Sequence, residues 1–170
     1  MLSVVIETRN HEDALARTLA SLVGGAVEGV VREVIVCDAG SSDRTHTVAD
    51  HAGCHYLADA HLEAGIRQAR SEWLLLLEPG ARLLDGWMDA VLAHAGDATG
   101  PARFQRARQS KQPFLARILS GRRPLAEGLM ITRRQALSLS QREPSAAAIA
   151  KAITARRLGA EIVVAPFSKG

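Results

Sequence analysis

The stretch EVIVCDAGSSDRT, residues 33–45, joins a buried strand to a turn-forming loop and then to the start of a helix. Residues 30–37 (VVREVIVC) form an apolar, β-branched run that is typical of a strand covered on both faces. The loop that follows is rich in turn-forming residues, and Ser42 or Asp43 can cap a helix that continues through residue 52. Strand, tight loop and helix in this order predict one unit of an α/β fold.

The same alternation continues through the first half of the chain. Residues 11–23 place apolar side chains on one helical stripe, and Gly24 and Gly25 are expected to end this helix. Right-handed crossovers between such units predict an α/β, Rossmann-like fold with a mostly parallel sheet and helices on both faces. The expected strands are residues 2–6, 30–37, 56–57 and 73–77, and the other expected helices are residues 62–70 and 85–94.

The pattern is weaker from residue 96 onward. We expect strands at residues 128–133 and 161–165 and a helix at residues 146–158. The segment from Arg103 to Arg123 is basic, contains no acidic residue, and has apolar residues such as Phe104 between its charges. It forms either an amphipathic segment against an anionic bilayer, as a peripheral membrane contact, or a solvated helix packed on the sheet. We expect one domain, residues 1–170.

The composition fits one domain with an aliphatic core, because 47% of the 170 residues are hydrophobic and only 4% are aromatic. Few aromatic side chains are available to stack on bases, so nucleic acid is not an expected partner. Cys37 and Cys54 have no zinc or redox spacing, which favours a reducing compartment. No basic leader precedes the first strand, and no apolar run reaches the ~20 residues of a membrane span. We expect a cytoplasmic protein, either free or peripheral at the inner face of a membrane.

Acidic residues follow three of the expected strands. These residues are Glu7, which Thr8 follows, Asp38 and Glu78. Ligands of open α/β sheets bind at such carboxyl ends of strands. The Asp38 carboxylate can accept a hydrogen bond from a base N–H, while Gly40 and Ser41 let the backbone turn and present N–H groups. The loop therefore has the features of a nucleotide site. The alternative is that Asp38 and Asp43 only form Asx-turns and cap a helix.

Three motifs in this order resemble the family 2 glycosyltransferases, whose nucleotide-binding half has the GT-A fold. They are SVVIETRNHEDALARTLASL (residues 3–22), EVIVCDAGSSDRT (33–45) and ARSEWLLLLEPGARL (69–83). The chain is most similar to a short bacterial subgroup, which implies a nucleotide-binding half at residues 1–95 and a shortened acceptor half at 96–170. The resemblance also implies that Thr8, Asn10 and Asp38 line a uracil and ribose pocket, with Asp38 reading the base.

The chain departs from the family at the metal motif. The fourth strand of the family ends in Asp-x-Asp, whose carboxylates hold a divalent cation such as Mg²⁺ or Mn²⁺. Here the corresponding residues are Glu78, Pro79 and Gly80, so the second ligand is missing and a bound Mg²⁺ or Mn²⁺ is in doubt. Glu78 is either the remnant of a metal or sugar contact, an exposed residue after a strand, or a contact for another ligand. Arg82 or Arg103 could supply part of the cation's charge.

The expected position of the general base has also changed. The family offers an acidic pair at the start of a C-terminal helix, where one member acts as base on the acceptor hydroxyl. Alanines 146–148 stand there in this chain, and Glu143 is the nearby carboxylate that could serve as the base or cap the helix.

The leading hypothesis is a family 2 glycosyltransferase-like protein. It would bind a nucleotide-sugar, a UDP-sugar, and transfer the sugar to a glycan or lipid-linked acceptor. The alternative is a catalytically inactive binding or regulatory protein of an envelope or polysaccharide pathway, because the metal and base positions have both changed. A nucleotidyltransferase is disfavoured, since its glycine- and lysine-rich loop is absent from ETRNHED, residues 7–13.

Overall fold

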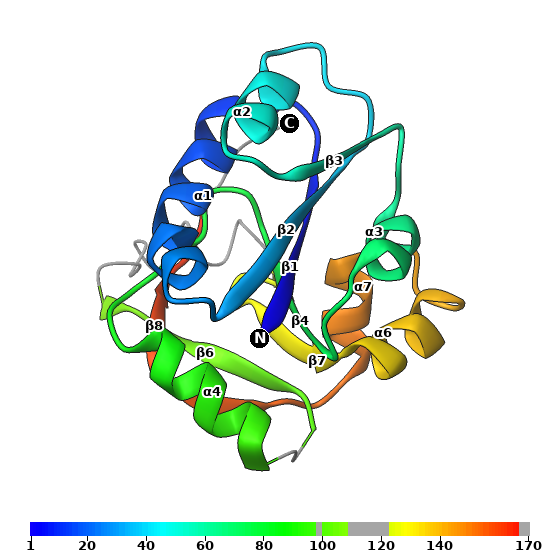
Figure 1. Ribbon diagram of the computed structural model, residues 1–170. Coiled ribbons are helices and arrows are strands. Elements are labelled where there is room, and N and C mark those ends of the chain that lie inside the picture. Colours follow the sequence, from blue (N-terminus) through cyan, green and yellow to red (C-terminus); the bar gives the residue numbers. More distant parts are fainter. Residues whose placement is uncertain (98–99, 109–122, 167–170) are drawn as a thin grey trace, which may run out of the picture.

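The computed structural model describes residues 1–97, 100–108 and 123–166. These residues form one eight-stranded sheet with helices packed on both faces (Figure 1). The strands are β1 (Leu2–Thr8), β2 (Val31–Asp38), β3 (His55–Ala58), β4 (Trp73–Leu77), β5 (Arg82–Leu83), β6 (Ala102–Arg106), β7 (Leu129–Thr132) and β8 (Arg156–Val163). The helices are α1 (Glu12–Val27), α2 (Thr45–His51), α3 (Leu62–Gln68), α4 (Trp87–Asp97), α6 (Arg133–Ser140) and α7 (Ala146–Ala152).

The strand order is β3-β2-β1-β4-β7-β6-β8-β5. The first four strands of this order are parallel, with β1 between β2 and β4. The sheet then changes direction, because β7 pairs antiparallel with β4 and with β6, whereas β6 and β8 are parallel. This mostly parallel sheet with helices on both faces confirms the predicted fold class.

The apolar core has two layers, one on each face of the sheet. One cluster joins the sheet to α1 and α4, and the other joins it to α3, α6 and α7. Figure 1 shows α1 and α2 on one side of the strands and α3, α6 and α7 on the other. All five residues of β4 are buried, which explains why WLLLL is a continuous apolar run rather than an alternating one.

Helix α1 continues past the two glycines that were expected to end it. It ends at Val27, and Gly25 lies inside the helix facing α4. A Cβ atom on Gly25 would lie 2.5 Å from the ring of Trp87, so glycine is needed there for close helix packing. Gly24, by contrast, is exposed and has only the end of the Met88 side chain at 4.0 Å. The expected helix stop was therefore wrong, because a packing glycine was interpreted as a terminator.

The second half differs more from the prediction. Helix α7 ends at Ala152 instead of residue 158, because Ile153 has an extended backbone and a strand begins at Arg156. Buried Leu158, Ala160 and Ile162 alternate with exposed residues along β8, which is the period of a strand. Helix α6 was not predicted.

The basic segment from Arg103 to Arg123 is described only at its ends, since residues 109–122 lie outside the described residues. Its first part is strand β6, and Phe104 is fully buried in the core. Phe104 therefore cannot contribute to a membrane-facing surface, and the start of the segment is not helical. Within residues 1–97, 100–108 and 123–166, no helix is both long and apolar enough to cross a membrane.

Candidate functional site

The three acidic strand ends lie at the same edge of the sheet, because β2, β1 and β4 are neighbouring parallel strands. Their carboxylates do not converge in one crevice, however. Glu7 accepts a hydrogen bond from the N–H of Ala146 at the start of α7 (2.7 Å), whereas Glu78 lines a pocket beside α1. Adjacent residues of a strand face opposite sides of the sheet, so Glu7 and Thr8 point in different directions. The three strand ends therefore share an edge of the sheet without sharing one crevice.

Asp38 is the most enclosed of these carboxylates, with 2% of the residue exposed. It accepts hydrogen bonds from the Ser41 N–H (2.8 Å), the Ser41 hydroxyl and the Tyr56 hydroxyl (2.8 Å). Burial alone would raise the pKa of Asp38, but the hydrogen bonds from Ser41 and Tyr56 outweigh it and hold the pKa below its usual value. Asp38 is therefore an anion fixed in one orientation at the end of β2.

Asn10 connects the end of β1 to the same loop. Its N–H donates to the Ser41 hydroxyl (2.7 Å), and its side-chain oxygen accepts from the Ser42 N–H (2.7 Å). Gly40 has a φ of 87°, which glycine adopts without strain. Asn10, Asp38, Gly40 and Ser41, which were predicted to bind a nucleotide, thus belong to one local network. Thr8 is buried beneath it, with its hydroxyl 3.4 Å from a ring nitrogen of His11.

Asp43 ties this loop to two helices. It accepts hydrogen bonds from the Thr45 N–H (3.0 Å) and the Thr45 hydroxyl (2.5 Å) at the start of α2. Its other oxygen accepts from the N–H of Glu12, the first residue of α1 (3.1 Å). The predicted cap residue was wrong, because the N-cap of α2 is Arg44, whose side chain forms no capping hydrogen bond. Asp43, one residue earlier, instead accepts from Thr45 and joins the start of α2 to that of α1.

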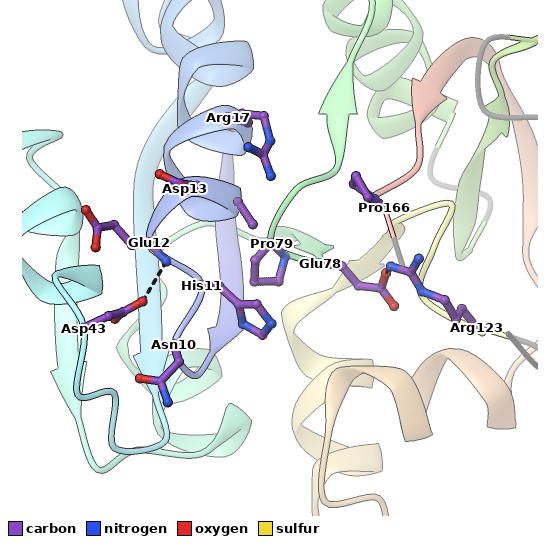
Figure 2. A pocket seen from close by; sticks show the side chains of 11 residues that line it. Asn10, His11, Glu12, Asp13, Arg17, Asp43, Glu78, Pro79, Arg123 and Pro166 are labelled. Atoms are coloured by element: carbon purple, nitrogen blue, oxygen red, sulfur yellow. Dashed lines mark hydrogen bonds and ion pairs between the residues drawn. The ribbon is translucent and has the colours of Figure 1, made fainter. Parts of the chain in front are cut away.

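A pocket of about 660 Å³ lies between the first turns of α1 and the end of β4 (Figure 2). Glu78 points across it toward Arg123 and forms an ion pair with that guanidinium. Arg123 also donates to the carbonyl oxygen of Ala165 (2.6 Å), and its side chain is only 24% exposed. The residues that line the pocket are Asn10, His11, Glu12, Asp13, Ala14, Arg17, Asp43, Glu78, Pro79, Arg123 and Pro166.

Most carboxylates of this pocket are already engaged. Glu12 pairs with Arg44 at 2.8 Å, Asp43 accepts from backbone N–H groups, and Glu78 is bound by Arg123. A guanidinium has five N–H donors, so Arg123 has donors beyond the two that contact described residues.

The structure places neither Arg82 nor Arg103 in the pocket beside Glu78, where the paired cation is Arg123. Arg82 is exposed on β5, and Arg103 donates to the carbonyl oxygen of Ala150 in α7. Arg123, which contacts Glu78, is 45 residues away from it in the sequence. It was one of several arginines in a basic run, and no local pattern distinguished it.

The residues present do not fit a divalent cation at the family's metal position. Gly80 is buried with a φ of 93°, and its N–H donates to the Thr18 hydroxyl (2.8 Å). A Cβ at this position would lie 3.0 Å from the Cβ of Ala165, so a second carboxylate is disfavoured by both backbone and packing. Glu78 remains as one ligand, and Arg123 occupies it. Across the described parts of the chain, no group of three or more His, Cys, Asp or Glu residues could hold a metal ion.

Glu143, the predicted base, lies in the turn between α6 and α7 and does not line the pocket beside Glu78. Its N–H donates to the Leu139 carbonyl oxygen (2.9 Å), and Ser145 rather than Glu143 caps α7 by accepting from the Ala148 N–H (3.2 Å). The carboxylate at the first residue of α7 is that of Glu7. Burial raises the pKa of Glu7, although hydrogen bonds from the Ala146 and Leu62 backbone act against this.

The low pKa of Asp38 predicts an acid-dependent loss of stability. The contribution of ionised Asp38 to the free energy of unfolding is fully present above the unfolded-state pKa of about 3.9. It is lost as the pH falls through the lower pKa of the folded state. The free energy of unfolding, measured with urea between about pH 7 and pH 3, should therefore fall more steeply for the unmodified protein than for Asp38→Asn. Asp89→Asn, at an exposed residue of α4, is the matched control and should follow the unmodified protein. Parallel curves for the unmodified protein and Asp38→Asn would contradict the assignment.

Comparison with known proteins gives one family and one fold. The family model described as "Glycosyl transferase family 2" matches residues 3–151. No curated protein matches the chain. Among solved structures, mannosyl-3-phosphoglycerate synthase from Rubrobacter xylanophilus is 18% identical with a TM-score of 0.57, and the match covers 79% of this chain and 54% of that one.

Two further structures match more of the chain. Glucosyl-3-phosphoglycerate synthase from Mycobacterium tuberculosis, in complex with Mn²⁺, UDP and glucosyl-3-phosphoglycerate, is 16% identical with a TM-score of 0.60, covering 99% of this chain and 73% of that one. TarS 1–349 from S. aureus is 15% identical with a TM-score of 0.65, covering 92% and 57%. The chain thus spans little more than half the length of two of these three proteins, and at this identity the likeness shows the fold alone.

Proposed function

Because the chain belongs to glycosyl transferase family 2, we propose that it binds a nucleotide-sugar, a UDP-sugar, where β1, β2 and β4 end, and transfers the sugar to an acceptor. The observation that carries this proposal is the fixed network of Asn10, Asp38 and Ser41 beside the pocket that Glu78 and Arg123 line. Similar proteins have been solved with UDP and with UDP-glucose, which supports the choice of nucleotide.

Each predicted residue has a proposed role in nucleotide binding. The Asp38 carboxylate is the predicted acceptor of a base N–H. Thr8 and Asn10 border the base and ribose, while Gly40 and Ser41 keep the loop close to the nucleotide. In this proposal residues 1–95 bind the nucleotide and residues 96–170 bind the acceptor.

The transfer step places negative charge on the diphosphate. The acceptor oxygen forms a bond to the anomeric carbon, the bond from that carbon to the diphosphate oxygen breaks, and UDP leaves with the electron pair. Arg123, with Arg17 on the opposite wall, can neutralise this charge through N–H groups aimed into the pocket. The acceptor proton goes to a base; Glu143 was predicted for this role but does not line this pocket.

The acceptor in this proposal is a glycan or a lipid-linked molecule reached from the cytoplasmic side of a membrane. The exposed arginines of β6 and β8 support an anionic acceptor surface, since basic side chains are attracted to anionic lipid headgroups.

A catalytically inactive binding protein is the second candidate. The Glu78–Arg123 ion pair favours it, because the pair fills the metal position with a contact inside the protein. The inactive protein would bind UDP-sugar without releasing sugar, so the two candidates differ in one measurable product.

Calorimetric titration with UDP tests the proposal. The unmodified protein should bind UDP, and Asp38→Ala should weaken binding about ten-fold because a hydrogen bond to a charged group is lost. Glu63→Ala, which removes an exposed carboxylate paired with Arg67 on α3, is the control and should bind normally. Absence of UDP binding to the folded, unmodified protein would overturn the proposal. Incubation with UDP-glucose, in which water can take the place of the acceptor, and detection of free UDP then separates enzyme from binding protein.

A further inference from the structure

A second pocket, of about 470 Å³, also has Arg123 in its lining. It is formed by β6, β8, the end of α7 and the turn that precedes β7. Among the described residues its lining is strongly basic, with five cationic side chains and one carboxylate. The cations are Arg103, Arg106, Arg123, Lys151 and Arg157, and the carboxylate is Glu127. We call this the basic pocket.

The single carboxylate is shared between two of the cations. Glu127 accepts from the Nε of Arg106 at 3.0 Å and from a terminal nitrogen of Arg157 at 2.5 Å. The two arginines are held side by side by one negative charge, so this part of the pocket keeps an excess of positive charge. The cationic side chains of the pocket repel one another unless an anion binds between them.

Two further cations add to the excess. Arg103 donates to the carbonyl oxygen of Ala150, but its Nε is buried and has no hydrogen-bond partner among the described residues. Burial lowers the pKa of Arg103, which reflects the cost of holding this charge away from water. Lys151, on the last turn of α7, is exposed and forms no ion pair with any described residue. A buried donor without a partner is costly, and an anion that fills the pocket would relieve this cost.

We propose that the basic pocket binds the phosphate or carboxylate group of the sugar acceptor. That the bound molecule is a sugar acceptor rests on the proposed function, whereas the anion site itself rests on the charges described above. Arg123 lines both pockets, so an anion in the basic pocket lies next to the site proposed for the departing diphosphate. The acceptor is then an anionic molecule whose hydroxyl reaches the first pocket while its charged group stays in the second.

Titration with inorganic phosphate, with calorimetric detection at low salt, tests the site. Lys151→Gln removes one exposed cation without breaking an ion pair to a described residue and should weaken phosphate binding about three-fold. The double variant Lys151→Gln/Arg157→Gln should weaken it about twenty-fold, because a guanidinium contact is also lost. Arg32→Gln, an exposed arginine of β2 on the distant part of the sheet, removes the same charge and should leave binding unchanged.

Arg17→Gln distinguishes the two pockets, since Arg17 lines only the first pocket and Lys151 only the second. Phosphate affinity that falls in Arg17→Gln and not in the Lys151 variants would overturn the proposal, as would an equal loss in Arg32→Gln. Titration with UDP reports on the proposed function separately. A protein that binds phosphate through Lys151 but does not bind UDP would keep the anion site and lose the glycosyltransferase assignment.

The source of the anion is resolved by a second arm of the experiment. Sedimentation with phosphatidic acid vesicles, compared with phosphatidylcholine vesicles, tests a lipid phosphate. Binding that depends on Lys151 and on phosphatidic acid supports a lipid-linked acceptor, and phosphate binding without vesicle binding supports a small, freely diffusing one. If the protein binds neither phosphate nor vesicles, the proposal is overturned.

Discussion

UDP binding is expected to weaken about thirty-fold in Arg123→Gln and to change less than about two-fold when divalent metal is removed from the unmodified protein. The physical reason is that Arg123 stands where the cation of a metal-dependent site would act, paired with Glu78 and directed into the pocket. Gly80 has no carboxylate, and its backbone conformation and its contact with Ala165 disfavour a side chain at this position. Calorimetric titration with UDP in EDTA and in Mn²⁺ measures both effects.

Two control variants sharpen this experiment. Arg82→Gln removes an exposed arginine on β5 that does not line the pocket, and it should bind UDP normally. Arg123→Lys retains the charge but loses the planar fork of donors, so it should recover only part of the affinity. An affinity that rises about ten-fold or more with Mn²⁺, or that is unaffected by Arg123→Gln, would contradict the prediction.

The largest loss of stability is expected from Gly25→Ala. The new methyl group would meet the ring of Trp87 at 2.5 Å, which is too close for real atoms and forces α1 away from α4. Overpacking of this kind costs about 1–3 kcal/mol, and we expect the upper part of that range because Trp87 is 4% exposed and has little room to move. Urea unfolding of both proteins gives the difference in the free energy of unfolding.

Gly24→Ala is the control in the same helix. It makes the same chemical change at an exposed position, where only the end of the Met88 side chain is near. Alanine favours a helix over glycine by about 1 kcal/mol, so this variant should be as stable as the unmodified protein or more stable. Equal losses in both variants would show that the two glycines share a role unrelated to Trp87.

Most of the first half of the fold could be predicted, because its central strands are largely buried on both faces and leave apolar runs in the sequence. The strands at residues 2–8, 31–38 and 73–77 illustrate this, whereas the strand at residues 55–58 is at the edge of the sheet and only partly buried. The second half was harder, since its elements are short and their signals conflict. Alanines favour a helix through residues 146–152, and nothing in composition marks the change to a strand at Arg156.

The candidate site also has one part that could be predicted from the sequence and one that could not. The turns within the loop from Asp38 to Thr45 could be predicted, because the Asp38–Ser41 and Asp43–Thr45 contacts join residues close in the sequence. The contacts of this loop with Asn10 and Tyr56 are long-range and were not predicted. The Glu78–Arg123 ion pair and the Glu7–Ala146 hydrogen bond join residues 45 and 139 positions apart. Such pairs depend on how the chain folds back, and a single sequence carries no record of them.

The double contact of Asp43 has a consequence for the motion of the loop. One carboxylate holds the first turns of α1 and α2, so neither helix start can fray without releasing the other. The loop between them therefore opens and closes as a single cooperative unit rather than residue by residue. A nucleotide would meet a loop that is already ordered, and little conformational entropy would be lost when it binds.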